Sequence, residues 1–132
     1  MFSRFIFFGF IGLLGEIIFT AGKDAILKKN YQLSGRTSLW MFPLYGLIAF
    51  FFPLIAHHVS SFSWWGRGII YMIVFYIVEY VAGSLLRRFN ACPWQYPSRL
   101  SIGGRIYLPF APVWFLAGLS IEWIYPYVTR SL

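Results

Sequence analysis

The chain has 132 residues, of which 59% are hydrophobic, 23% aromatic and 11% charged, and its net charge is +7. Soluble domains carry about 25% charged residues, so this composition excludes a water-soluble fold, while the length suffices for four membrane-spanning helices. The single cysteine, Cys92, excludes an internal disulfide and a cysteine-rich metal site. We therefore expect one integral membrane domain of the all-α class over residues 1–132.

The first predicted span covers residues 5–22, which we interpret as a retained helix because an acid interrupts its apolar run. Gly9, Gly12, Glu16 and Thr20 recur at helical spacing and share one face. Small residues let helices approach closely in lipid, and a polar residue among them faces the bundle. Glu16 then either lines a functional cavity or bonds across a packing seam, and both interpretations stay open.

The second predicted span covers residues 39–57 and follows a basic loop. Residues 25–27 are apolar among lysines, which predicts that the first helix continues as an amphipathic turn on the membrane surface. The span ends in His57 and His58. We interpret these as interfacial residues and expect no metal site, since no acid or cysteine is predicted at their depth.

The third predicted span covers residues 67–86 and carries a single acid, Glu79. A carboxylate at the centre of a span costs roughly 2.5–3.5 kcal/mol on insertion scales, so its presence is a functional-site hypothesis by default. Tyr76 and Gly83 share its helical face, which places a hydroxyl one turn away from the carboxylate.

The fourth predicted span covers residues 106–127, after a loop that its prolines and glycines make irregular. It carries Glu122 near its far end. Arg67, which opens the third span, is expected at the same depth, so we predict a structural ion pair between Glu122 and Arg67.

Lysines and arginines are distributed unequally between the two predicted sides of the membrane. The loops after the first and third spans hold eight of them, and the opposite side holds three. The positive-inside bias therefore predicts a multi-pass protein of the cell membrane with both loops in the cytoplasm and both termini outside. This topology and attraction to anionic lipid headgroups account for the net charge, so nucleic acid is not expected as a partner.

A short pattern recurs in the two halves of the chain. Residues 35–43 and 104–112 both read GRxxLxxxP, and each copy opens the second helix of a pair whose first helix carries a glutamate. This predicts two tandem, parallel helix-pair repeats, residues 1–62 and 63–132.

The acids and their expected neighbours form a candidate substrate or proton site. If the first and third spans run in the same direction, their glutamates lie at similar depth, with an arginine at the entry to each following span. A site of this kind could bind a cation, a proton or a polar headgroup. No activated nucleophile is recognisable, so no cofactor is expected and an enzymatic role is less favoured. The residues assigned to it are Glu16, Glu79, Tyr76, Arg36, Arg105, Trp40 and Tyr45.

Several longer motifs occur in a fixed order along nearly the whole chain. They are GEIIFTA (15–21), TSLWMFPLYG (37–46), RGIIY (67–71), EYVAG (79–83), ACPWQY (91–96) and the late Glu122. In these motifs the chain resembles the family labelled putative ABC-transporter type IV, CmpB-like, and the vertebrate transmembrane protein 229 proteins. The resemblance implies transport. The chain has no GxxxxGK[ST] motif, so any ATPase would be a separate chain.

Three functions remain open from the sequence. The first is a permease-like or transporter-associated membrane protein with a buried glutamate site. The second is a structural or assembly partner, as a homo-oligomer or beside another subunit, in which the glutamates join helices. The third and least favoured is a membrane-embedded enzyme acting on lipid, because catalysis needs residues that the sequence does not place.

Overall fold

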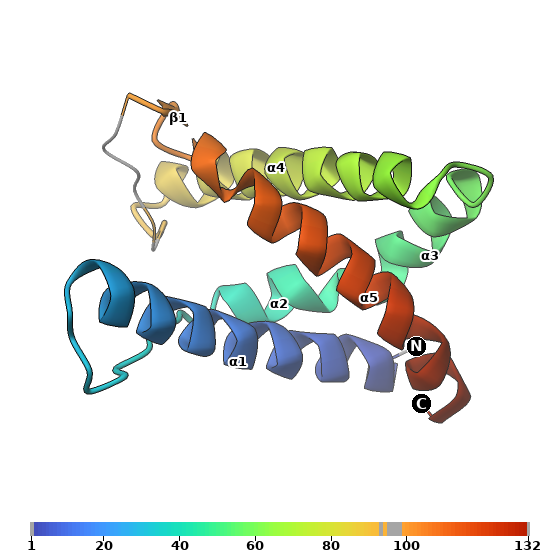
Figure 1. The fold of residues 1–132 in the computed structure, drawn as a ribbon, viewed down its shortest axis with the longest axis horizontal. Coiled ribbons are helices and arrows are strands. Elements are labelled where there is room, and N and C mark those ends of the chain that lie inside the picture. Colours follow the sequence, from blue (N-terminus) through green and yellow to red (C-terminus); the bar gives the residue numbers. More distant parts are fainter. Residues whose placement is uncertain (1, 93, 95–98, 132) are drawn as a thin grey trace. The chain divides into compact units, whose positions relative to one another are not determined.

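The computed structural model describes residues 2–92, 94 and 99–131, and it is mostly helical (Figure 1). Four helical stretches are long and apolar enough to cross a membrane, namely Phe2–Leu27, Met41–His58, Trp64–Arg88 and Leu108–Ser131. At most 22% of the most apolar window of any of these stretches is buried inside the protein. The side chains left exposed are largely Phe, Leu, Ile and Trp, which water would not solvate. The structure thus confirms the predicted all-α membrane class with four spans.

The first compact unit, residues 2–55, is a helical hairpin, which we call hairpin 1. Helix α1 (Phe2–Leu27) lies along α2 (Met41–Gly46) (Figure 1). Its Phe5 ring also lies 5.9 Å from the ring of Phe50 in α3 (Ile48–His58). Where the helices meet, aromatic rings of one helix pack directly against glycines of the other. A Cβ at Gly12 would lie 2.0 Å from the ring of Tyr45, and one at Gly46 would lie 2.7 Å from the ring of Phe5. Glycine at these positions is what allows the close approach.

The second compact unit, residues 56–131, is hairpin 2. Helix α4 (Trp64–Arg88) packs against α5 (Ala111–Ser131), which the 3-10 turn η1 (Leu108–Phe110) introduces. Between the helices, β1 (Ser101–Ile102) and β2 (Ile106–Tyr107) form an antiparallel pair with Ile102 opposite Ile106. Rings again face glycines, with Phe115 over Gly68 and Tyr71 over Gly118.

The helix bounds differ from the predicted ones in ways that the backbone explains. α1 continues through the predicted amphipathic turn to Leu27, and its last turn ends where Lys29 takes a positive φ of 53°. The second span begins at Met41 and is divided at Leu47. The fourth begins at Leu108 and not at residue 106, because Ile106 and Tyr107 are extended and pair with β1. Half of the ACPWQY motif, residues 93, 95 and 96, lies outside the described residues.

Candidate functional site

Glu16 lies in α1, within an apolar span, and it is half-buried. The Thr37 hydroxyl donates a hydrogen bond of 2.8 Å to its Oε2, and the side chain of Tyr45 forms a second hydrogen bond to the carboxyl group. Within the part of hairpin 1 that the structure describes, no lysine or arginine forms an ion pair with Glu16. Its contacts there are therefore neutral hydroxyls from two different segments.

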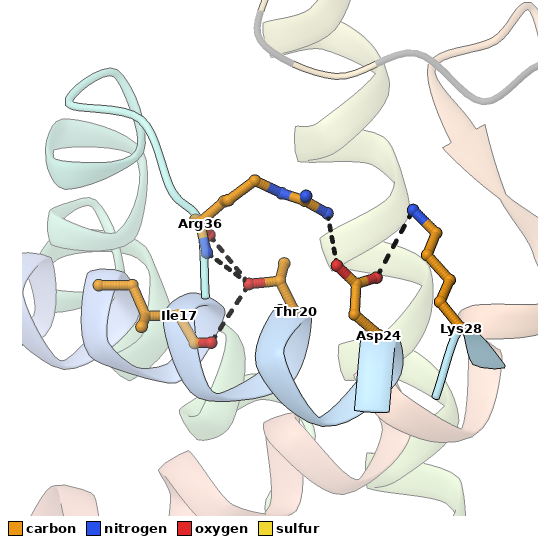
Figure 2. Close-up of polar contacts among 5 residues, drawn as sticks. All are labelled: Ile17, Thr20, Asp24, Lys28 and Arg36. Carbon is orange, nitrogen blue, oxygen red and sulfur yellow. Dashed lines mark hydrogen bonds and ion pairs between the residues drawn. The ribbon is translucent and has the colours of Figure 1, made fainter. Parts of the chain in front are cut away.

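The segment that carries Thr37 returns along α1. Residues 33–38, which we call the returning segment, have no regular secondary structure. A Cβ at Gly35 would lie 2.0 Å from the carbonyl oxygen of Ile17, so a side chain there would push the segment away from α1. The next residue, Arg36, donates its backbone N–H to Thr20 Oγ1 at 2.7 Å (Figure 2). Irregular backbone is tolerated at membrane depth only when protein groups or water satisfy it in this way.

Asp24 is a buried acid that the sequence analysis missed. It is 4% exposed, and Arg36 Nη2 lies 3.1 Å from its Oδ2 while Lys28 Nζ lies 3.9 Å from its Oδ1 (Figure 2). Glu16, Thr20 and Asp24 are spaced by four residues each, so they share one face of α1. Continuing the predicted Glu16–Thr20 face by four more residues would have identified Asp24. Arg36, which was expected at the entry to the second span, pairs through its guanidinium with Asp24.

In hairpin 2, the residues predicted around Glu79 hold the strand pair against α4. Glu79 is half-buried and acts electrostatically on Tyr76. The Tyr76 hydroxyl lies 3.1 Å from the Tyr107 carbonyl and 3.0 Å from the Leu108 carbonyl. The guanidinium of Arg105, which lies between β1 and β2, is 5.0 Å from the ring centre of Tyr80 in α4.

Two further residues complete this description. Arg87, which was not among the predicted site residues, donates to the carbonyls of Gly103 at 2.7 Å and Gly104 at 2.9 Å. Trp40, which was among them, has 51% of its surface exposed. Glu16 and Glu79 belong to different hairpins, and a shared site between them remains a prediction.

Glu122 in α5 forms an ion pair with Arg67 in α4. Arg67 Nε lies 2.9 Å and 3.2 Å from its two carboxylate oxygens, and the Tyr71 hydroxyl donates to one of them. The Arg67 Nη1 also donates to the carbonyl of Phe62 at 2.7 Å. The structure therefore brings Arg67 and Glu122 into an ion pair across the two helices of hairpin 2.

The family model for the putative ABC-transporter type IV proteins matches residues 3–132. The chain belongs to that family. No solved structure matches it. As a family member with four candidate spans, it is a multi-pass membrane protein in contact with a lipid bilayer.

Glu16 and Glu122 differ in the protonation states to which their partners can form hydrogen bonds. A hydroxyl both donates and accepts hydrogen bonds, whereas a guanidinium only donates. Thr37 and Tyr45 can therefore form hydrogen bonds to Glu16 either as a carboxylate or as a carboxylic acid, whereas the positive charge of Arg67 favours Glu122 as a carboxylate. Among residues 2–92, 94 and 99–131, no three His, Cys, Asp or Glu side chains gather as metal ligands would.

Proposed function

We propose that this protein is a permease-like or transporter-associated membrane component in which Glu16 binds and releases a proton or a small cation. One observation carries the proposal. Glu16 lies within a span and is held by the hydroxyls of Thr37 and Tyr45, which can donate hydrogen bonds to its charged form and accept one from its neutral form. An intramembrane acid that can change its protonation state marks an ion or proton pathway more often than a static contact.

A structural or assembly role is the second candidate, and the Glu122–Arg67 pair supports it. This pair joins α4 to α5, and the Tyr71 hydroxyl adds a second bond to the same carboxylate. Such a contact holds helices together without any exchange of protons. The two candidates differ in which acid is indispensable, because transport would depend on Glu16 and assembly on Glu122.

The proposal is tested with purified protein in liposomes that contain a pH-sensitive dye. A sodium or potassium pulse outside should move protons through the parent protein, and Glu16→Gln, which keeps the shape and fixes the neutral form, should reduce this movement to the level of empty liposomes. Gly15→Ala is the matched control, because an added Cβ there meets no atom within 4 Å. If Glu16→Gln transports like the parent for both cations, the structural role takes its place.

We also propose the orientation with both basic loops in the cytoplasm, where their charges face anionic headgroups. The eight-to-three distribution of lysine and arginine supports it. Arg99 is exposed in the second of these loops. In cells, Arg99→Cys in a Cys92→Ser background should react with a membrane-impermeant thiol reagent only after the cells are permeabilised. Reaction in intact cells would reverse the orientation.

We further propose that the two hairpins are repeats of one unit. Matching Glu16 to Glu79 and Arg36 to Arg105 sets a register for each pair of helices, and contacts recur in that register. The Phe5–Gly46 contact of hairpin 1 corresponds to Gly68–Phe115 in hairpin 2, with ring and glycine exchanged. The Gly12–Tyr45 contact likewise corresponds to the stacked rings of Phe75 and Trp114, 4.9 Å apart. Contacts between corresponding positions in both hairpins support a common ancestral packing.

A further inference from the structure

The backbone of Arg36 is held by one side chain of α1. The Thr20 hydroxyl accepts the Arg36 N–H at 2.7 Å and lies 3.2 Å from the Arg36 carbonyl oxygen (Figure 2). Both main-chain polar groups of one residue therefore meet the same hydroxyl. This contact fixes the position along the axis of α1 at which the returning segment crosses the helix.

The side chain of Arg36 is held by Asp24, one helical turn beyond Thr20. The carboxylate of Asp24 is buried on a helix, so it offers a fixed anchor, whereas the side chain of Arg36 is 63% exposed. Thr20 and Asp24 together restrain Arg36 at its backbone and at its guanidinium. Two restraints at separate points prevent both sliding and rotation of the segment around that residue.

Thr37 follows Arg36 directly, and its hydroxyl is the donor that reaches Glu16 at 2.8 Å. We infer that Thr20 and Asp24 are positioning residues that set this donor against Glu16, so that the hydrogen bonding of the acid is controlled from further along α1. The inference rests on the proposed function of Glu16, and it adds the residues that build the site.

Hairpin 2 shows what the same fold looks like without this arrangement. In the proposed register, Thr20 corresponds to Gly83 and Thr37 to Ile106, and neither has a hydroxyl. Asp24 corresponds to Arg87, which binds the carbonyls of Gly103 and Gly104. In hairpin 2 the returning strand is thus held by an arginine on its carbonyls, so the pair of hydroxyls at positions 20 and 37 is specific to hairpin 1.

Dicyclohexylcarbodiimide tests the inference, because it adds to a protonated carboxyl in an apolar site. The acid O–H adds across one C=N bond, and the adduct rearranges to a stable N-acylurea on the glutamate with no group lost. The full chain in liposomes is labelled about two pH units above the pH at which the parent reacts at half its maximal rate, where only a small fraction of Glu16 is protonated and a tenfold increase can be measured. The Glu16 peptide is quantified by mass spectrometry.

Thr20→Val removes the hydroxyl with little change in volume, so it should release Thr37 and deprive the charged acid of a donor. Glu16 should then label about tenfold faster, since a hydrogen bond to a charged group corresponds to a factor of about ten or more. Thr20→Ser retains the hydroxyl and should restore the parent rate. Labelling of Thr20→Val at the parent rate overturns the inference.

A double variant shows whether Thr20 acts through Thr37. Thr37→Val alone should accelerate labelling, and Thr20→Val combined with it should add nothing, because the donor is already absent. Additive acceleration would mean that Thr20 acts by another route and would overturn the inference.

A substitution of Lys28 serves as the control for a substitution of Asp24, because both residues belong to the same ion pair. Asp24→Asn should accelerate labelling of Glu16, whereas Lys28→Met, which removes the other cation on the same carboxylate, should label like the parent. A net-charge effect would have opposite signs in the two variants, because loss of the Asp24 charge would slow labelling and loss of the Lys28 charge would accelerate it. Slower labelling of Glu16 in Asp24→Asn would therefore remove Asp24 from the positioning role.

Amide hydrogen exchange of residues 33–38 separates this inference from the proposed function. Thr20→Val frees the Arg36 N–H and should speed its exchange about tenfold or more, whatever the protonation state of Glu16. If Glu16 fails to label at any pH in the parent, the proposed function fails, and faster exchange of Arg36 in Thr20→Val would then show a structural clasp only. Unchanged exchange would reject the positioning role itself.

Discussion

Glu16 and Glu122 are both acids within predicted spans, and the two hairpins satisfy them differently. Hairpin 2 gives Glu122 a guanidinium on both oxygens and a tyrosine hydroxyl, so its charge is compensated within the fold. Hairpin 1 gives Glu16 two hydroxyls, and its Arg36 pairs with Asp24. We propose that the partner of a carboxylate, more than its position in a span, decides whether it exchanges a proton.

The difference matters because the two arrangements are suited to different tasks. A charge pair resists change, since removing either member leaves an uncompensated charge. A carboxyl group among hydroxyls can gain or lose a proton while its neighbours reorient their own O–H bonds. Hairpin 2 therefore has the local chemistry of a fixed joint, and hairpin 1 that of an exchangeable site.

The largest effect should come from making Glu16 resemble Glu122. Thr37→Lys supplies a cation in place of a hydroxyl and should hold the Glu16 carboxylate in its charged form. We expect proton movement in liposomes to fall to background and carbodiimide labelling of Glu16 to fall about tenfold or more. Thr37→Gln, of similar length and no charge, is the control. Labelling that survives in the lysine variant would contradict the role given to the hydroxyl.

The converse change should make Glu122 resemble Glu16. Arg67→Gln removes the cation, and we expect a loss of about 2 kcal/mol in the free energy of unfolding, less than for a fully buried pair because the side chains of Arg67 and Glu122 are 24% and 30% exposed. Titration with a denaturing detergent measures the loss, and Glu122 should become reactive to the carbodiimide. Adding Glu122→Gln should recover part of the stability. A double-mutant cycle without coupling would reject the pair as a structural joint.

A smaller effect tests how Tyr45 reaches Glu16. Gly12→Ala places a methyl group 2.0 Å from the Tyr45 ring, so the ring must shift, and we expect a loss of about 1–3 kcal/mol in the free energy of unfolding. Gly15→Ala on the same helix should change stability by no more than about 1 kcal/mol. Faster labelling of Glu16 in Gly12→Ala would link the ring position to the acid. Equal stability of the two variants would show that the Gly12 contact is not a tight one.

The membrane class and the number of spans could be predicted from composition and hydropathy, because apolar length alone decides whether a helix can cross a bilayer. The sequence also placed Glu122 and Arg67 at one expected depth, and the structure holds the two in an ion pair. Such inferences need only position along a helix. They involve no knowledge of the path of a loop.

Sequence periodicity also put Glu16 and Thr20 on one face of α1, since helical spacing is a local property. The partners of that face were decided by tertiary structure. Arg36 was expected at the entry to the second span, and its guanidinium pairs with Asp24. Thr37, which was not assigned to the site, donates to Glu16. The reason is physical, because consecutive residues of an extended segment point in different directions. The close contact of Gly35 with α1 and the bonds of Arg36 to Thr20 and Asp24 therefore decide which residue of the segment meets Glu16.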